Sequence, residues 1–368
     1  MKKFISLVLV FVMIFCLAAC GGKTEQSSTT TTAPATSTPS TQPAATQQEK
    51  PYEFQKQDLL AAFGYTTGSP EAVIMEEMAA ELNERTNGQV SMQFMFNSEG
   101  YSTDQRIPAI LSGDLALIPG QGCADLARYY ERLNVFAAPY VFNNKDHMLN
   151  FWHSKDGQAL IDEVAAATGL RLMDFVVTGT RCISLDEDKK ISCRADLSKY
   201  VIRMMTADAW QVMGYALGAG GVVPLAATEL YVGCQTGTID GQDNPLPNVL
   251  TYALQEVQES ITLTNHYVYD QPFIISEEFW QAQDPEFKEV FSDVIAECCD
   301  KINAYNDEKT EKAFTTIADA GVTIYELTND EINAYRNEVL DWYKTDEKGK
   351  AFYDTWDMDL YNLAMSYQ

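Results

Sequence analysis

The side chains of this sequence that could bind or transform a small molecule are mainly arginines set among many acids. Arg203 lies near the end of the apolar segment YVIRMM, where a charge is costly unless it has a partner. Arg181 follows a glycine in TGTR. A guanidinium carries parallel donors that fit a carboxylate, so either residue could bind an anion. Two structural roles stay open: an ion pair for Arg203 and an exposed turn position for Arg181.

A second polar segment is QTGTIDGQDNP, at residues 235–245. Gly237 can end a helix, Asp240-Gly241 can reverse the chain, and Pro245 favours an extended conformation for Asn244. The segment could be an ordinary surface turn. It could also present the amide of Asn244 to a ligand.

Motifs for catalysis or for metal binding are scarce. The sequence contains no G-x-S-x-G, no G-x-x-x-x-G-K and no H-E-x-x-H. Acid pairs such as Asp240 and Asp243 arise easily by chance among 52 acidic residues, so a glycosidase-like pair has weak support. We expect no cofactor and no metal, because the histidines are scattered and the cysteines after Cys20 match no zinc pattern. A disulfide between Cys182 and Cys193 stays open, because the two could lie on neighbouring strands.

The charge balance excludes some partners. The 52 acidic residues outnumber the 26 basic ones and give a formal net charge of −26. Such a chain is repelled by nucleic acid and by anionic membrane surfaces. We therefore expect no nucleic-acid partner and no direct membrane binding.

The N-terminus has the layout of a secretory signal. Lys2 and Lys3 precede an apolar run from Phe4 to Leu17, and LAAC ends at Cys20. This arrangement resembles a bacterial lipoprotein signal, with residues 1–19 removed and Cys20 lipidated. An ordinary cleaved signal or an uncleaved anchor stays possible. Residues 20–50 then form a Ser/Thr/Pro-rich tether, which predicts an extracytoplasmic protein held on the outer face of the cytoplasmic membrane or in the periplasm.

The elements that must position these residues alternate between strands and helices. Ser69-Pro70 begins a helix that ends at Asn87-Gly88, and period-two alternation then predicts a strand from Val90 to Phe96. The segment TDQRIPAILSGD then predicts a short helix, with Pro108 confining its regular part, and LALIP at 115–119 predicts a buried strand. This order is typical of an open α/β sheet, in which ligands bind outside the carboxyl ends of strands.

The later elements continue this alternation. We expect a helix over 145–168, the strand LRLMDFVV, a turn at TGTR and the strand YVIRMM. Helices follow after Asp208 and from Thr228 to Gln235. Beyond residue 276 the pattern is mainly helical, with GVTIYELT as one late strand.

Several segments, taken in order, resemble the DctP-type solute receptors of TRAP transporters. They are ILSGDLALI, LNVFAAPYVF, ADLSKYVIR, LGAGGVVPLAATELYVGCQTGTIDGQDNPL and TNHYVYDQPFIIS, and the likeness runs from about Phe63 to Trp342. The resemblance implies an α/β, two-lobed periplasmic-binding-protein-like fold with mixed sheets, hinge strands and a long helix connecting the lobes. It assigns 51–178 plus 270–308 to lobe I and 179–269 plus 309–368 to lobe II.

The resemblance also implies a function. A receptor of this family is not an enzyme; it closes on a small organic acid and delivers it to the membrane subunits of a sodium-coupled TRAP permease. Arg203 matches the arginine that clamps the ligand carboxylate, Asn244 matches the asparagine that binds the same group, and Arg181 matches a second contact. Further pocket candidates are Asp104, Gln121, Asn265, Gln271 and Ala227.

The chain departs from the family pattern in places that bear on the ligand. Met204 stands where the family has a proline, and Ala227 stands where many members have an aromatic residue, which indicates a roomier or differently shaped pocket. PGQGCAD offers Gln121 and Asp125 in the first-lobe contact region. The acid stays open among dicarboxylates, uronates, 2-oxo acids and sialic acid. Two other classes of function stay open as well: a receptor for another importer or a sensor, and a secreted acidic hydrolase.

Overall fold

The computed structural model describes residues 52–97 and 99–368. The predicted signal segment 1–19, the predicted lipidation site Cys20 and the tether 20–50 lie outside the described residues. Residues Tyr52–Gln368 form one structural unit. Within the part of the chain that is described, no helix is both long enough and apolar enough to cross a bilayer.

The first elements confirm the β-α-β prediction. Strand β1 (Gln57–Ala62) pairs in parallel with β2 (Val90–Met95), and helix α1 (Pro70–Arg85) connects them. The Ser69 hydroxyl caps α1 by accepting a hydrogen bond from the Ala72 N–H at 3.2 Å. The capping side chain of Ser69 and the proline at the first helical position, Pro70, therefore act together to start this helix.

The next two elements differ in length from the prediction. Helix α2 (Thr103–Ser112) continues through Pro108, although a proline inside a helix removes one main-chain hydrogen bond. Strand β3 (Ile118–Pro119) is shorter than the predicted strand 115–119. Leu117 still forms an isolated parallel bridge to Ala61, so the segment does join the β structure.

The chain then continues through short helices and the strands of a larger sheet. In chain order these elements are α3 (Cys123–Leu126), η1 (Glu131–Ala137), α4 (Lys145–His153), α5 (Lys155–Thr168), β4 (Leu170–Leu185), η2 (Arg194–Leu197), β5 (Val201–Met204), α6 (Asp208–Ala216), β6 (Gly221–Pro224), η3 (Ala227–Glu229), α7 (Leu230–Gln235), β7 (Gly241–Asn244), α8 (Leu246–Thr251), η4 (Leu254–Glu256), β8 (Ser260–Ser276), α9 (Glu277–Ala282), α10 (Pro285–Asp319), β9 (Thr323–Glu326), α11 (Asn329–Thr345), α12 (Glu347–Tyr353) and α13 (Met358–Met365).

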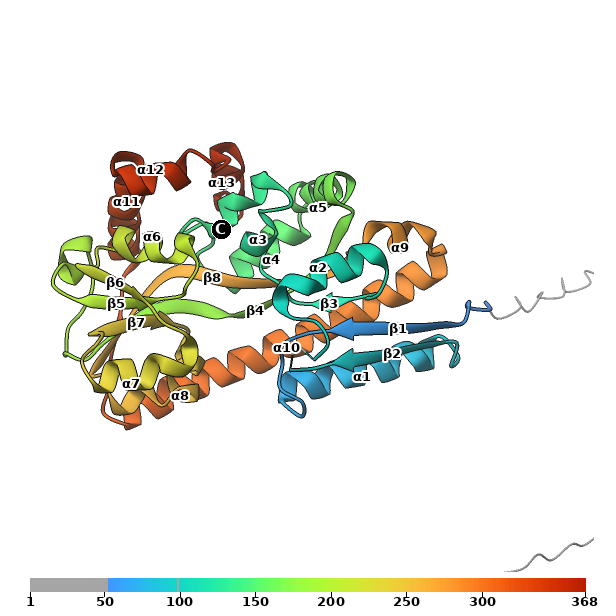
Figure 1. The fold of residues 1–368 in the computed structure, drawn as a ribbon, viewed down its shortest axis with the longest axis horizontal. Helices are drawn as coiled ribbons and strands as arrows, with labels where there is room; N and C mark the ends of the chain where they lie inside the picture. The colour runs from blue at the N-terminus through green and yellow to red at the C-terminus, as the bar shows by residue number, and fades with distance from the viewer. Residues whose placement is uncertain (1–51, 98) are drawn as a thin grey trace, which may run out of the picture. The chain divides into compact units, whose positions relative to one another are not determined.

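A seven-stranded mixed sheet runs through this unit. Its order is β3-β8-β4-β7-β5-β6, with β9 beside β8. The long strands β4 and β8 pair antiparallel along most of their length and pass from one half of the unit to the other (Figure 1). The mixed sheet, these two shared strands and the long helix α10 agree with the fold that the sequence predicts.

The predicted turn at TGTR is wrong, because β4 runs straight through it. The register of β4 against β8 shifts between Val177 and Thr180, and Gly179 adopts a positive φ of 127°. Asn306 donates a hydrogen bond to the Val177 carbonyl at 3.0 Å, so the irregular backbone keeps its partners. A glycine and a bulge therefore bend the strand without ending it.

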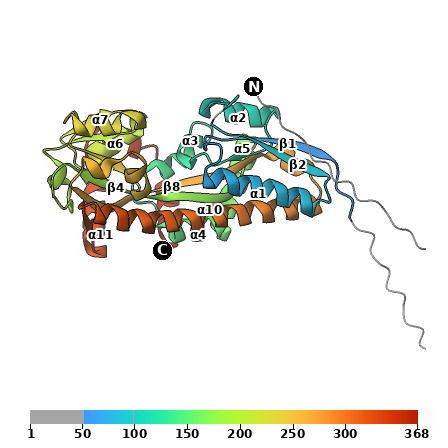
Figure 2. The same cartoon turned by 90° about the horizontal axis from the view of Figure 1, so that it is seen from below.

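Helix α10 spans the unit beneath the sheet, as Figure 2 shows from below. It contacts α1 at one end, β4 in the middle and α8 at the other end. The helix predicted over 145–168 is instead two helices, α4 and α5, separated at Ser154. A Cβ on Gly157 would lie 2.2 Å from the Phe151 carbonyl oxygen, so the close packing of the two helices requires glycine at this position.

The C-terminal helix α13 packs on elements of predicted lobe I. The Tyr361 hydroxyl donates to the Tyr140 carbonyl at 3.2 Å, and His147 Nε2 lies 2.8 Å from the Ala364 carbonyl oxygen. The predicted division puts 309–368 in lobe II, whereas these contacts tie its last helix to α4 and to the segment after η1. The lobe boundaries stay a prediction.

Cys182 and Cys193, whose pairing the sequence left open, are both free cysteines in the structure.

Candidate functional site

The sheet register gathers the predicted carboxylate-binding residues at one edge. Strands β5 and β7 are parallel, and Arg203 pairs with Gln242. Strand β4 runs antiparallel to β7, and Cys182 pairs with Asn244. Arg181, Arg203 and Asn244 therefore lie together near the carboxyl ends of β5 and β7, which is where ligands bind in such sheets. We call these three residues and Asp243 the arginine cluster.

Arg203 is held in place by a main-chain carbonyl. Its Nε and Nη2 groups donate to the Leu225 carbonyl oxygen at 2.8 and 2.6 Å. The residue is 4% exposed, and burial lowers the pKa of its guanidinium. The other N–H groups of the guanidinium form no hydrogen bond to the described residues, so Arg203 can offer them to an anion.

Arg181 is paired with a carboxylate of its own. Its Nε donates to Asp243 Oδ2 at 2.6 Å, and Nη2 donates to the Asp243 carbonyl at 2.8 Å. Burial alone would raise the pKa of Asp243, but the charge and hydrogen bond of Arg181 and the nearby His266 hold it well below its usual range. The interpretation of residues 235–245 as an ordinary surface turn is therefore wrong at Asp243, since this residue is a fully buried strand position.

Two further side chains enclose this ion pair. The guanidinium carbon of Arg181 lies 4.9 Å from the ring centroid of Trp210, a cation–π contact. His266 Nε2 lies 3.5 Å from Asp243 Oδ2, and its Nδ1 lies 2.8 Å from the Thr264 hydroxyl. Burial lowers the pKa of His266, so it is neutral at pH 7 and leaves Arg181 as the cation that balances Asp243.

Asn244 is oriented by a buried chain of amides. Its Oδ1 accepts from Arg181 Nη2 at 3.4 Å, and its amide nitrogen donates to Gln242. Gln242 in turn donates to the Ser184 hydroxyl at 2.7 Å, which donates to Gln258 at 2.8 Å. Each member is satisfied by the next, and such networks hold a side chain in one orientation.

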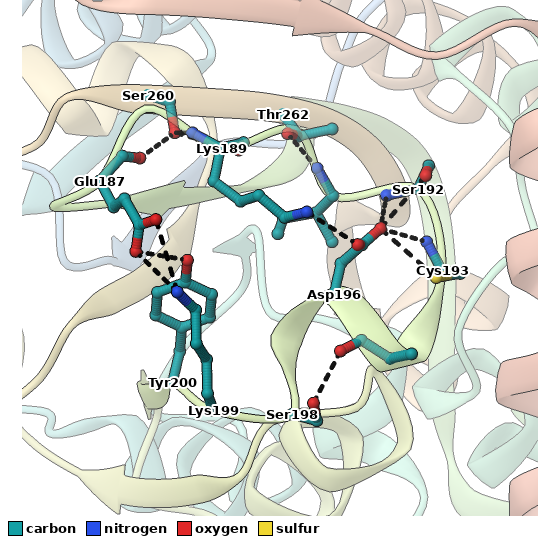
Figure 3. Close-up of polar contacts among 12 residues, drawn as sticks. Glu187, Lys189, Ser192, Cys193, Asp196, Ser198, Lys199, Tyr200, Ser260 and Thr262 are labelled. Carbon is teal, nitrogen blue, oxygen red and sulfur yellow. Dashed lines mark hydrogen bonds and ion pairs between the residues drawn. The ribbon is translucent and has the colours of Figure 1, made fainter.

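The loop before β5 fixes where that strand begins. Figure 3 shows the Asp196 carboxylate between Lys189 and the main-chain N–H groups of Ser192 and Cys193, with distances of 3.0, 2.9 and 3.2 Å. Burial raises the pKa of Asp196, but the N–H group of Ser192 and Lys189 lower it to about 2. Ser260 of β8 also accepts the Lys189 main-chain N–H at 3.2 Å. These bonds tie the loop to the sheet and so set the position of Arg203.

A cavity of about 340 Å³ lies on the lobe I side. Its polar lining includes Tyr65, Arg106, Gln121, Asp125, Tyr269 and Gln271, and we call it the Gln121 cavity. Gln121 is 3% exposed, while Asp125 is accessible to solvent from the cavity. Desolvation by the surrounding protein raises the pKa of Asp125, and the negative charge of Asp104 adds to this effect.

Tyr269 and Trp210 connect the Gln121 cavity with the arginine cluster. The ring centroids of these two residues lie 6.5 Å apart, and Trp210 is the ring that contacts Arg181. Tyr269 also lines the cavity. The two groups of polar side chains are therefore linked through these two aromatic rings.

The other predicted pocket residues lie farther from these centres. Asp104 is exposed in an ion pair with Arg128 at 3.0 Å and lines a cavity that adjoins Gln121. Asn265 occupies the irregular part of β8 with a φ of 49°. Ala227 is half-buried in η3, after the Leu225 carbonyl that holds Arg203. Roles for all the predicted residues in ligand contact stay predictions.

Sequence reasoning missed several residues of the site. Arg106, Tyr269 and Trp210 were not among the candidates, and Asp270 lies buried behind the cavity, where its Oδ2 accepts the Cys123 N–H at 3.2 Å. Arg106 offered one usable signal: an arginine beside the apolar residues of a helix in a chain of strong negative charge. The aromatic residues offered none, because core and site aromatics look alike in sequence.

Comparisons with known proteins point to one family. The family model for bacterial extracellular solute-binding protein family 7, DctP, matches residues 63–348. The C4-dicarboxylate-binding periplasmic protein DctP of Vibrio cholerae is 26% identical over 274 residues, which cover 74% of this chain and 81% of that protein. The sialic acid-binding periplasmic protein SiaP of the same species is 26% identical over 251 residues, covering 67% and 75%.

Solved structures agree with the sequence comparisons. A TRAP periplasmic solute binding protein from Roseobacter denitrificans with bound 3-deoxy-D-manno-oct-2-ulosonic acid is 25% identical, with a TM-score of 0.71, covering 85% of this chain and 100% of that one. Another from Ochrobactrum anthropi is 24% identical with a TM-score of 0.76, covering 85% and 95%. The predicted two-lobed α/β binding fold is thereby confirmed.

Proposed function

This chain belongs to family 7 of the bacterial extracellular solute-binding proteins, and we propose that it is the extracytoplasmic receptor of a TRAP transporter for a small organic acid. It binds its ligand and releases it unchanged to the sodium-coupled permease subunits in the membrane. The relatives from Vibrio cholerae and Roseobacter denitrificans support binding rather than turnover, since they are named as solute-binding proteins.

The observation that carries the proposal is the state of Arg203. Asp243 already balances the charge of Arg181 through a 2.6 Å ion pair, whereas among the described residues Arg203 bonds only a neutral carbonyl, that of Leu225. A buried guanidinium without a carboxylate partner favours a bound anion, because pairing offsets the cost of its burial. The ligand carboxylate therefore binds Arg203, with Asn244 and Arg181 beside it.

Lobe closure completes the mechanism. The irregular parts of β4 and β8 allow the two lobes to move, and α10 lies along both of them. A ligand that bonds Arg203 in lobe II and the cavity side chains of lobe I stabilises the closed state. Only this difference in affinity between closed and open forms can shift the equilibrium. The permease then recognises the closed form.

The N-terminal sequence supports a lipid anchor. LAAC at residues 17–20 supplies a cysteine for acylation, and the polar segment after it supplies a tether. We place the receptor on the outer face of the cytoplasmic membrane, or in the periplasm, attached through Cys20. Replacing Cys20 by alanine should move the protein from the membrane fraction to the soluble fraction, and continued retention would point to an uncleaved anchor.

The substitution Arg203→Lys tests the carboxylate site. A lysine ammonium cannot bond the Leu225 carbonyl and a carboxylate with the same planar fork, so affinity for the cognate acid should fall at least about tenfold. A thermal-shift screen of uronates, aldonates, dicarboxylates, 2-oxo acids and sialic acid first finds the acid. Isothermal titration calorimetry on wild type and variant then measures the loss.

Arg85→Lys is the matched control. Arg85 forms exposed ion pairs with Glu81 and Glu297 on the far part of lobe I, so its replacement should leave affinity unchanged. Equal affinity of Arg203→Lys and wild type would remove Arg203 from the binding site. If no acid in the screen shifts the melting temperature, the proposal of an organic-acid receptor fails.

A further inference from the structure

The Gln121 cavity contains a side-chain amide that is not paired within the part of the chain that the structure describes. Neither the side-chain nitrogen nor the side-chain oxygen of Gln121 has a hydrogen bond among the described residues, although the residue is only 3% exposed. Its main-chain N–H donates to the Pro272 carbonyl at 3.3 Å, which fixes the backbone. Leaving a buried polar group unpaired costs about 1–3 kcal/mol, so such a group is a strong candidate for a ligand contact.

The polar side chains that line the cavity favour a ligand that both donates and accepts hydrogen bonds. Arg106 presents a cation and lies 5.2 Å from the Phe63 ring, whereas Asp125 presents an acceptor to the same cavity. Gln121 can do both, because an amide has donor and acceptor ends. A hydroxyl group matches this lining, since it also donates and accepts. A carboxylate could pair with Arg106, but it has no hydrogen to donate to the Asp125 carboxylate or to the oxygen of the Gln121 amide.

Acidic groups on this side also oppose a second negative charge. Asp125 lines the cavity, and Asp270 lies fully buried behind it against the Cys123 N–H. Both carboxyl pKa values are raised, that of Asp270 to about 6, by burial. Burial already disfavours the ionised form of these two carboxyl groups, and an anion placed near them would add like-charge repulsion.

The cavity has the size and walls for a ring or chain of carbons with hydroxyl groups. Its volume of about 340 Å³ is in the lower range of small-ligand sites, about 300–1,000 Å³. Phe63, Tyr65 and Tyr269 contribute aromatic surface on which apolar C–H groups can pack. Tyr269 lines the cavity and lies 6.5 Å from the ring of Trp210, which contacts Arg181, so the cavity lies on the side of the arginine cluster where these two rings are placed.

We propose that the cavity binds the uncharged, hydroxylated end of a polyhydroxy monocarboxylate of the uronate or aldonate type, and that Gln121 and Asp125 determine this specificity. The inference rests on the proposed function, in which Arg203 holds the carboxylate at the other end. Dicarboxylates of similar length are rejected because their second carboxylate faces Asp125 and leaves the acceptor end of Gln121 unpaired.

Calorimetric titration of the whole protein tests the ligand class. The probes are D-glucuronate, D-gluconate, succinate, L-malate and D-glucose. A hydroxy acid should bind at least about a hundredfold more tightly than succinate, the sum of about two hydrogen-bonded contacts. D-glucose, which lacks the carboxylate, should not bind measurably. If succinate or malate binds more tightly than both hydroxy acids, this inference is wrong while the receptor function stands. If no acid binds, both fall.

Two variants separate the roles of the cavity and the arginine cluster. Gln121→Ala should weaken hydroxy-acid binding about tenfold or more and leave succinate binding unchanged. Asp125→Asn should raise succinate affinity, because it removes the opposing charge. Arg203→Lys should instead weaken both kinds of acid.

Gln281→Ala is the control for truncating a glutamine. Gln281 is exposed in α9 and bonds Glu277 at 2.7 Å, so this variant should bind like wild type. Circular dichroism and melting temperature establish that each variant is folded. An equal loss of hydroxy-acid and succinate affinity in Gln121→Ala would overturn its role in specificity.

Discussion

The two walls of the site, the arginine cluster and the Gln121 cavity, differ in whether their buried polar side chains are bonded to the protein. In the arginine cluster Asp243 balances the charge of Arg181 at 2.6 Å, and the Leu225 carbonyl holds Arg203 in place, so both guanidinium groups are bonded to the protein. In the Gln121 cavity both ends of the Gln121 amide lack a partner among the described residues. The pKa values of the buried carboxyl groups also differ between the two regions: that of Asp243 is lowered, whereas that of Asp270 is raised to about 6.

This difference separates affinity from selectivity. The arginine cluster is preorganised, since its ion pair and amide chain are complete before a ligand arrives. A preorganised site needs little rearrangement on binding and so favours any ligand that carries a carboxylate. The Gln121 cavity is completed by the ligand, and it therefore discriminates among acids by what lies at their other end.

The largest expected effect comes from breaking the buried ion pair. Asp243→Asn would leave the Arg181 charge without its carboxylate, at a cost of about 3–5 kcal/mol in the free energy of unfolding. Urea denaturation followed by circular dichroism measures the loss at pH 7. Asp104→Asn is the control, because its ion pair with Arg128 is exposed and contributes only about 0–1 kcal/mol.

The pH dependence of this first effect has a defined sign. The folded-state pKa of Asp243 lies below its unfolded value, so its contribution to stability is present above about pH 4 and is lost as the pH falls. The gap between wild type and Asp243→Asn should therefore shrink in acid. A gap that stays constant down to about pH 3 would contradict the pairing.

An intermediate effect with the opposite sign is expected from Asp270→Asn. The pKa of Asp270 is raised from 3.8 to about 6 by burial, so ionising it destabilises the folded state as the pH rises through about 6. The variant should be more stable than wild type at about pH 7.5, on the order of 2 kcal/mol, with little of this advantage at about pH 4. Thermal melts of both proteins across this pH range measure the difference. An advantage independent of pH would contradict the assignment.

The smallest expected effect concerns the aromatic residue between the two walls. Trp210→Leu removes the cation–π contact with Arg181, which is worth about 1 kcal/mol, together with ring contacts to Tyr267 and Tyr269. Trp280→Leu is matched to it, since Trp280 contacts Lys288 at 5.4 Å outside the site. Both variants should lose stability in urea titrations, but only Trp210→Leu should also weaken ligand binding. Equal ligand affinity in the two variants would show that Trp210 does not link the walls.

Much of the fold could be predicted from the sequence because local signals carried it. Ser69 and Pro70 start α1, and alternating apolar residues define β2. The prediction failed at TGTR, where a glycine that usually marks a turn instead forms a bulge in β4. A turn and a bulge need the same local freedom of the backbone, and only the neighbouring strand β8 decides between them.

The candidate site was likewise predicted only in part. By itself the sequence determined the family pattern, with Arg203 on a strand and Asn244 before a proline, because these depend on residues close together in the chain. Only the tertiary structure decided that Asp243 is buried against Arg181, that Leu225 holds Arg203, and that Gln121 lacks a partner among the described residues. These are facts of pairing across the sheet and between lobes, and many acids could have met each arginine until the fold selected one.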